Sequence, residues 1–139
     1  MLGTYETVKK WFDCLARKDY DSYYELIDDD IAWINLRTVE GVNDCLPWLG
    51  ELHGKEAVLK SYGVFGEVAA LVPGSFVLHD IHVDGDTAIA HLHEKMKVHK
   101  NGAEYAIDGT FLMRVINDKV VYWESFWDTS GAIKAIKGD

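Results

Sequence analysis

Residues 84–102, DGDTAIAHLHEKMKVHKNG, decide the fold, because one long alternating segment lies between an Asp-Gly and an Asn-Gly dipeptide. The even positions from Ala88 to Val98 are apolar except for Glu94, whereas the odd positions are mainly histidine and lysine. Side chains alternate between the two faces of a strand, and both dipeptides favour tight hairpin turns. The pattern predicts a strand whose even positions face the core, with an antiparallel neighbour on each side.

The two turn dipeptides also predict the register of the neighbouring strands. A two-residue turn at Asp84-Gly85 brings His79 onto the inner face of the sheet. A two-residue turn at Asn101-Gly102 sets Glu94 opposite Gly109, which has no side chain. We therefore expect open space for a ligand beside Glu94, although a glycine at this point also suits a kink in a curved sheet.

A third turn, at residues 117–119, is expected to hold three residues and to lead into the last strand. It would set Ser125 opposite Phe111 and bring Trp123 and Trp127 onto the same inner face. We expect these four side chains to line the pocket and bind the substrate.

Length and composition fit one globular domain over residues 1–139, because 48% of the 139 residues are hydrophobic and 12% are aromatic. The net charge of −9 argues against nucleic acid and anionic membranes as partners. Cys14 and Cys45 follow no secretory signal, so we expect reduced thiols in a cytoplasmic protein. No apolar run in the sequence is long enough to span a bilayer.

The first half of the chain supplies further candidate pocket residues. Apolar spacing predicts three helices, over residues 4–15, 19–27 and 55–68, and one strand over residues 31–36. Trp33 and Asn35 share one face of that strand, and Tyr62 lies on the apolar face of the third helix. Residues 37–52 read as a long irregular segment in which Trp48 could close over a ligand. The run Asp28-Asp29-Asp30 is expected to form a solvated turn.

These elements, in this order, resemble the cone-shaped α+β fold of the nuclear transport factor two-like superfamily, and specifically its SnoaL-like branch. The matching segments are residues 30–33, 52–58, 84–86 and 119–128. The resemblance implies a strongly curved, mainly antiparallel sheet wrapped on three helices around a conical cavity. It also implies a homodimer formed through the outer face of the sheet.

Known catalytic sets of related families transfer only in part. Limonene-epoxide-hydrolase-like enzymes use an Asp–Arg–Asp set helped by a tyrosine and an asparagine. By the resemblance, the first Asp falls on Glu94, the Arg on Leu92 and the second Asp on Ser125. The asparagine falls on Asn35 and the tyrosine on Trp33. Water activation by that set is therefore disfavoured here.

Two other mechanisms of the superfamily also lack their key groups. In ketosteroid isomerases the base position falls on Asn35, the tyrosine on Trp11 and the second Asp on Phe111. In SnoaL-like cyclases the carboxylate of the last strand would stand at Ser125. The resemblance therefore indicates the fold well and the reaction poorly.

Glu94 is the leading catalytic candidate. Burial in an apolar pocket disfavours the charged carboxylate, so its pKa should rise into the range of a general acid or base. The alternative is a structural glutamate paired with an arginine or a hydroxyl. His79 reads as a proton partner or a hydrogen-bonded core histidine, and Asn35 as a group that orients a substrate oxygen or a water. Tyr62 supplies a phenol or packs in the core.

The sequence favours a cofactor-independent enzyme that moves a proton in a small, apolar, cyclic substrate, as an isomerase, cyclase or lyase. A binding or accessory module without turnover is the competing class, and a protein-interaction module with a filled cavity is the third. His91 and His93 have a zinc-like spacing, but the predicted register puts them on the outer face, where an interface is expected. We expect no metal and no cofactor.

Overall fold

The computed structural model describes residues 2–138, and within this range seven strands form one curled sheet. The strands are β1 (Ile27–Asn35), β2 (Gly50–His53), β3 (Ala69–Leu71), β4 (Val77–Asp84), β5 (Thr87–Val98), β6 (Glu104–Ile116) and β7 (Lys119–Phe126). Their order is β2-β1-β7-β6-β5-β3, and β4 also pairs with β5. β1 and β7 run parallel, whereas the other neighbours are antiparallel.

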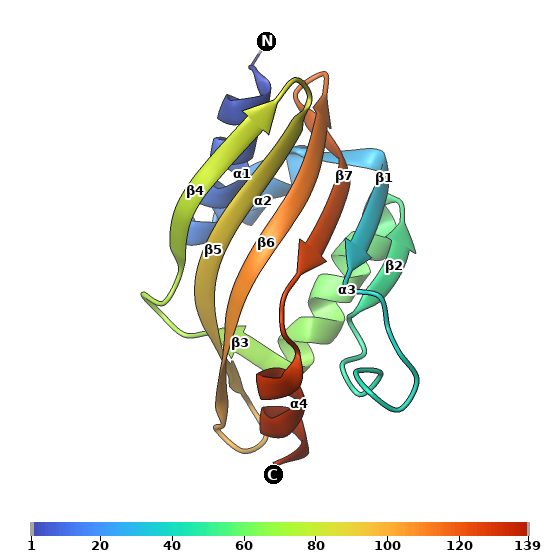
Figure 1. Ribbon diagram of the computed structural model, residues 1–139, viewed down its shortest axis with the longest axis vertical. Helices are drawn as coiled ribbons and strands as arrows, with labels where there is room; N and C mark the ends of the chain where they lie inside the picture. Colours follow the sequence, from blue (N-terminus) through green and yellow to red (C-terminus); the bar gives the residue numbers. More distant parts are fainter. Residues whose placement is uncertain (1, 139) are drawn as a thin grey trace.

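The helices of the described range are α1 (Thr4–Arg17), α2 (Tyr20–Glu25), α3 (Lys55–Val68) and α4 (Ser130–Lys137). Figure 1 shows α1, α2 and α3 on one face of the curved sheet, with α4 at its lower end. The predicted α+β class with a curved, mainly antiparallel sheet is confirmed, and α4 is added to the three predicted helices. Of the predicted domain over residues 1–139, the two end residues lie outside the described range. No helix within residues 2–138 has the length and apolar character needed to cross a membrane.

α1 and α2 bring aromatic rings over the concave face of the sheet. On α1, Val8, Trp11 and Phe12 recur at helical spacing and are at most 2% exposed. The Asp19 carboxylate begins α2 by accepting a hydrogen bond from the Ser22 N–H at 3.3 Å. This cap fixes the start of the short helix and so directs Tyr23, which is fully buried, toward the sheet.

The first hairpin differs from its predicted register. Asp84 pairs with Thr87, so the turn is made by Gly85 and Asp86 rather than by Asp84 and Gly85. A bulge between Leu78 and Asp80 then adds one residue to β4. Each added residue reverses which side of the sheet the following side chains face.

The predicted inner-face position of His79 is therefore wrong. The bulge turns His79 outward, where it is exposed, and brings Leu78 against the core in its place. The His79 ring contacts the ring of His91 on the outer face, with centroids 4.9 Å apart.

The second hairpin is shifted by two residues from the prediction. Val98 donates its N–H to the Ala103 carbonyl at 2.8 Å, which leaves residues 99–102 as the loop. Glu94 consequently pairs with Ile107, and Gly109 pairs with Leu92. A shift of two preserves the faces, so the inner positions of β5 and β6 remain as predicted.

The third hairpin reaches the predicted pairing by a different route. Its turn has two residues, Asn117 and Asp118, both with a positive φ (53° and 63°). An irregularity between Arg114 and Val115 compensates for the missing turn residue. Ser125 lies opposite Phe111, as predicted.

Two other predictions for the first half of the chain are wrong. Asp28, Asp29 and Asp30 belong to β1 rather than to a turn, because the strand begins at Ile27. Residues 50–53 form β2, which takes up the end of the segment predicted to be irregular over residues 37–52. This short strand pairs with the end of β1, where Leu52 lies opposite Trp33.

Candidate functional site

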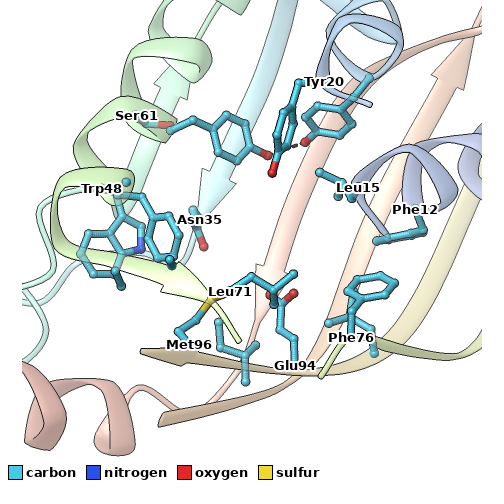
Figure 2. Close-up of a pocket in the computed structure, with 18 of the residues that line it drawn as sticks. Phe12, Leu15, Tyr20, Asn35, Trp48, Ser61, Leu71, Phe76, Glu94 and Met96 are labelled. Atoms are coloured by element: carbon cyan, nitrogen blue, oxygen red, sulfur yellow. Dashed lines mark hydrogen bonds between the residues drawn. The ribbon is translucent and has the colours of Figure 1, made fainter. Parts of the chain in front are cut away.

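A cavity of about 610 Å³ lies between the helices and the concave face of the sheet. Its walls are mainly apolar and aromatic side chains from α1, α2 and α3 and from β1, β3, β5, β6 and β7 (Figure 2). The volume is within the range of small-molecule sites. The cavity is open. A protein-interaction module of the same fold was expected to have a cavity filled by side chains.

Glu94 is the one carboxylate among the described residues that line the cavity. It projects from β5 between Leu92 and Met96, and Figure 2 shows its carboxylate directed into the cavity with Phe76 and Met96 nearby. The side chain is half-buried, because its head group borders the cavity rather than open solvent. Two other ionisable lining residues, Lys18 and His99, are exposed.

Burial raises the pKa of Glu94 from its ordinary value of 4.5 to about 7. Loss of hydration is the cause, and no positive charge or hydrogen-bond donor in the described range offsets it. The carboxyl group therefore exists in comparable amounts as acid and as base near neutral pH. Such a group can take a proton from a ligand and return it.

Tyr23 and Tyr62 add a pair of phenols to the same cavity. Their hydroxyl groups are hydrogen-bonded to each other. Burial raises the pKa of both phenols, and the negative charge of Glu94 raises both further. The pair is therefore neutral near pH 7 and lies within electrostatic reach of Glu94.

Asn35 stands at the end of β1 and is held by Ser125 of β7. Ser125 Oγ donates a hydrogen bond to Asn35 Oδ1 at 2.8 Å. Because Oδ1 is engaged and Asn35 lines the cavity, its amide N–H groups are left to face a ligand. Ser125 itself is 1% exposed and stands behind Asn35 rather than among the lining residues.

Stacked indoles form one wall of the cavity. The Trp33 and Trp123 rings are stacked with centroids 3.8 Å apart, and Phe111 lies 5.4 Å from Trp123. Trp33 Nε1 is buried and has no hydrogen-bond partner in the described range. Trp127 also lines the cavity, beyond the end of β7.

Trp48 is part of the wall and not an exposed lid. The side chain is 5% exposed and packs edge-on against Phe65 of α3, with ring centroids 5.1 Å apart. The surrounding segment supplies this contact because Leu46 and Leu49 are buried beside it. Trp48 is thus held against α3 as a fixed part of the cavity wall.

Gly109 does not open the gap that the predicted register implied. A Cβ at Gly109 would lie 3.0 Å from Phe111 Cε2 and 3.4 Å from Ile107 Cγ2. The space above the glycine therefore holds the Phe111 ring rather than part of a ligand site. The open volume lies instead above Glu94 and Leu92.

The histidines of the outer face contact one another and a carboxylate. His91 Nε2 and Asp108 Oδ1 are 3.0 Å apart across β5 and β6. Among residues 2–138, however, no group of three or more His, Cys, Asp or Glu side chains is arranged to hold a metal ion. His79, placed outside by the bulge, joins this surface group rather than Glu94.

The prediction overlooked Tyr23, which lines the cavity, and Tyr105, which is buried on the inner face of β6. Tyr23 lies within the helix predicted over residues 19–27, and nothing local in the sequence indicates its partner 39 positions away. Tyr105 shares the odd-numbered inner face of β6 with Ile107, a signal that the register could have supplied. Its hydroxyl is buried without a partner, and burial and the charge of Glu94 raise its pKa.

The model of the SnoaL-like domain family matches residues 8–123, which is most of the chain. The chain belongs to the SnoaL-like domain family. A comparison with curated proteins gives no match. The matched range runs from α1 into β7 and includes most of the residues that line the cavity.

Solved structures share the fold at low sequence identity. An NTF2-like protein from Burkholderia thailandensis E264 is 21% identical with a TM-score of 0.82, and the match covers 97% of this chain and 98% of that one. A "Putative Isomerase" from Rhodopseudomonas palustris is 15% identical with a TM-score of 0.80, covering 96% and 97%. An LEH-like epoxide hydrolase from M. tuberculosis is 12% identical with a TM-score of 0.68, covering 97% and 90%. At these identities the likeness concerns the fold alone.

Proposed function

We propose that this SnoaL-like protein is a cofactor-independent enzyme that transfers a proton within a small, apolar, cyclic substrate, as an isomerase, cyclase or lyase. Glu94 would be the general acid and base. The observation that carries the proposal is the Glu94 carboxylate, which borders an apolar cavity without a counter-charge and has a pKa of about 7.

The proposed reaction begins with the ionised form of Glu94. Its carboxylate takes a proton from a carbon next to a carbonyl group, and the electrons of that C–H bond move onto the carbonyl oxygen as an enolate. In an isomerisation the resulting carboxylic acid returns the proton to another carbon of the conjugated system. The carboxylate is then restored, and no other reactant is consumed. A pKa near the working pH suits both half-steps.

The walls of the cavity support a flat, apolar ligand. Trp33, Trp123 and Phe111 offer aromatic surface, and the Asn35 amide offers a hydrogen-bond donor near one end. An uncharged substrate suits the net charge of −9 as well as the apolar lining. The R. palustris structure is described as an isomerase, which agrees with the proposal, but this chain is similar to it in fold only.

Hydrogen–deuterium exchange tests the proposal without knowledge of the natural substrate. The protein is incubated in heavy water with apolar cyclic ketones such as tetralone, decalone and cyclohexenone, and deuterium next to the carbonyl is followed by NMR. We expect exchange above the buffer rate for at least one ketone, and a loss of about 100-fold or more in Glu94→Gln.

The matched control is Glu104→Gln, which changes the same side chain at an exposed position on β6. This variant should exchange at the wild-type rate. Wild-type exchange in Glu94→Gln would exclude Glu94 from the reaction.

A binding or accessory role without turnover is the second candidate. By the family resemblance, Leu92 and Ser125 occupy the positions of the arginine and second aspartate of limonene-epoxide-hydrolase-like sites. Here they are 3% and 1% exposed and neither carries a charge. Ketones that bind tightly, with no exchange in any of them, would favour this role.

We also propose a homodimer through the outer face of the sheet. Ile89 of β5 and Phe126 of β7 are 44% and 48% exposed on that face, and an interface there would remove their apolar surface from water. Light scattering after size-exclusion chromatography should give twice the monomer mass, and Ile89→Lys should shift it toward the monomer. A monomeric wild-type protein would refute the dimer.

A further inference from the structure

We propose that Tyr62 binds the carbonyl oxygen of the substrate and that Tyr23 positions the Tyr62 hydroxyl for this contact. The inference rests on the proposed function and names its substrate class: cyclic ketones and enones. Tyr62 would be the group that touches the reacting oxygen. Tyr23 would act through Tyr62.

The two rings are fixed by contacts with other aromatic side chains. Tyr23 meets Trp11 edge-on with ring centroids 4.5 Å apart, and Tyr62 meets Trp33 edge-on at 5.9 Å. The Tyr23 and Tyr62 rings are themselves perpendicular, with centroids 5.9 Å apart. Because each ring is held on the helix side of the cavity, the hydroxyl groups meet there without support from a ligand. The pair is therefore preformed.

Burial decides which hydroxyl serves the ligand. Tyr23 is 1% exposed, whereas Tyr62 is half-buried and borders the cavity. Each tyrosine hydroxyl carries one hydrogen, and the hydrogen bond between the two hydroxyl groups uses only one of these two hydrogens. If Tyr23 donates to Tyr62, the Tyr62 hydrogen remains available to the cavity.

Donation in this direction also strengthens the contact with a ligand. Either hydroxyl of the pair can donate to the other, and donation from Tyr23 leaves the free hydrogen on Tyr62, the less buried of the two residues. A hydroxyl group that accepts a hydrogen bond is polarised and donates its own hydrogen more strongly. Donation from Tyr23 therefore makes Tyr62 the better hydrogen-bond donor toward a ligand.

Glu94 faces the same space as the phenol pair. Its negative charge raises the pKa of Tyr23 and of Tyr62, so carboxylate and phenols lie within one electrostatic environment. When Glu94 removes a proton next to a carbonyl, the negative charge moves from the carboxylate to the carbonyl oxygen. A neutral phenol near that oxygen stabilises the new charge more than the original ketone.

A labelled ketone reports the contact directly. Tetralone with carbon-13 at its carbonyl is bound to the protein, and the carbonyl resonance is compared with the same ketone in hexane. We expect a downfield shift in the wild-type protein, a large reduction of that shift in Tyr62→Phe and a lesser reduction in Tyr23→Phe. Tyr24→Phe is the matched control, because Tyr24 lines the cavity but its hydroxyl is not part of the pair.

Each phenylalanine variant keeps the ring and its packing, so folding should be preserved. In Tyr62→Phe the Tyr23 hydroxyl loses its acceptor and could turn toward the ketone. The double variant Tyr23→Phe/Tyr62→Phe removes that substitute and should abolish the shift completely. An unchanged resonance in the double variant would overturn the proposal.

Kinetics separate the two roles. In the exchange reaction, Tyr62→Phe should lower kcat about 100-fold, and Tyr23→Phe about 10-fold, with little change in KM. A purely structural role would not move the carbonyl resonance.

The outcome also distinguishes this inference from the proposed function. A shift that depends on Tyr62, in a protein without any exchange activity, would leave the binding contact standing and remove the enzyme. Exchange that depends on Glu94 but is unaffected in both tyrosine variants would support the enzyme and overturn the contact between Tyr62 and the carbonyl oxygen.

Discussion

Ser125 Oγ donates a hydrogen bond to Asn35 Oδ1 at 2.8 Å and thereby joins the ends of the parallel strands β7 and β1 through their side chains. Ser125 is 1% exposed, so water does not compete for its hydroxyl. The bond occupies the amide oxygen of Asn35, so the amide N–H groups remain for a ligand in the cavity that Asn35 lines. A buried serine on one strand therefore decides which polar atom a ligand meets on the next.

Ser125→Ala should weaken both folding and ligand binding. Loss of this buried bond should lower the free energy of unfolding by about 1 kcal/mol in urea denaturation. Without it Asn35 can rotate, so affinity for a bound ketone should fall severalfold in an NMR titration. Ser61→Ala is the control, because Ser61 lines the same cavity but its hydroxyl bonds the Val58 carbonyl within α3. Equal loss of affinity in both variants would contradict the role of Ser125.

Replacement of Glu94 by glutamine should stabilise the protein in a pH-dependent way. The folded pKa of about 7 lies above the ordinary 4.5, so the folded state holds the proton to higher pH than the unfolded state. The wild-type protein therefore loses stability as pH rises from 4.5 through 7. Glutamine has no charge to bury, so Glu94→Gln should be more stable by about 3 kcal/mol above pH 8 and by little near pH 5.

Urea unfolding of both proteins at about pH 5 and about pH 8.5 checks this difference. Glu104→Gln, at an exposed position, should show no such trend. A difference between Glu94→Gln and wild type that stays constant with pH would mean that the carboxylate is not penalised by burial.

The exchange rate should rise with pH for the same reason. Proton abstraction needs the ionised form of Glu94, whose fraction increases through a pKa of about 7. Rates for free enzyme and substrate should climb about tenfold per pH unit well below that value and level off above it. The profile is measured as kcat/KM for deuterium incorporation. A rate that is flat from pH 5 to 9 would show that another group is the base.

The inner faces of β5, β6 and β7 could be predicted from the sequence because errors of two residues do not change side-chain direction. Glu94 was expected opposite Gly109 and lies opposite Ile107, yet it still faces the cavity. An error of one residue has the opposite consequence. The bulge in β4 leaves no signal in the alternation of its side chains, and so His79 was assigned to the wrong face.

The contact between Tyr23 and Tyr62 could not be predicted for a different reason. Each tyrosine lies on its own helix, and local spacing defines the apolar face of a helix but not its partner. The neutral, hydrogen-bonded state of the pair follows only from tertiary packing. The sequence thus indicated Glu94, Asn35 and Tyr62 but not the Tyr23 hydroxyl that is hydrogen-bonded to Tyr62.

His79→Ala should leave activity and stability nearly unchanged. The side chain is exposed and its contact is with His91 on the outer face, so the free energy of unfolding should stay within about 0.5 kcal/mol. Leu78→Ala is the neighbouring control, because Leu78 packs against the core and its loss should cost about 2 kcal/mol. Urea denaturation and the exchange assay check both variants. A strong loss of exchange in His79→Ala would return His79 to the reaction.

Gly109→Ala should displace the Phe111 ring and reduce the cavity. The added Cβ would lie 3.0 Å from Phe111 Cε2 and 3.2 Å from Cζ, closer than ordinary contacts. Phe111 is also packed against Trp123 and Phe12, at ring-centroid distances of 5.4 and 6.3 Å, so the open side for its movement is the cavity. Alanine gains about 0.5–1 kcal/mol over glycine within a strand, but overpacking costs about 1–3 kcal/mol. The clash should therefore prevail, with a net loss near 1 kcal/mol.

The displaced ring should lower affinity more for tetralone than for the smaller cyclohexenone, and NMR titration of both ketones measures this difference. Phe111→Leu removes the ring atoms that the new Cβ meets, so Gly109→Ala/Phe111→Leu should lose less than the sum of the two single variants. Stability and affinity should both show this coupling, because one side chain connects the glycine to the ligand space. Additive effects in the double variant would mean that the Phe111 ring is not what Gly109 makes room for.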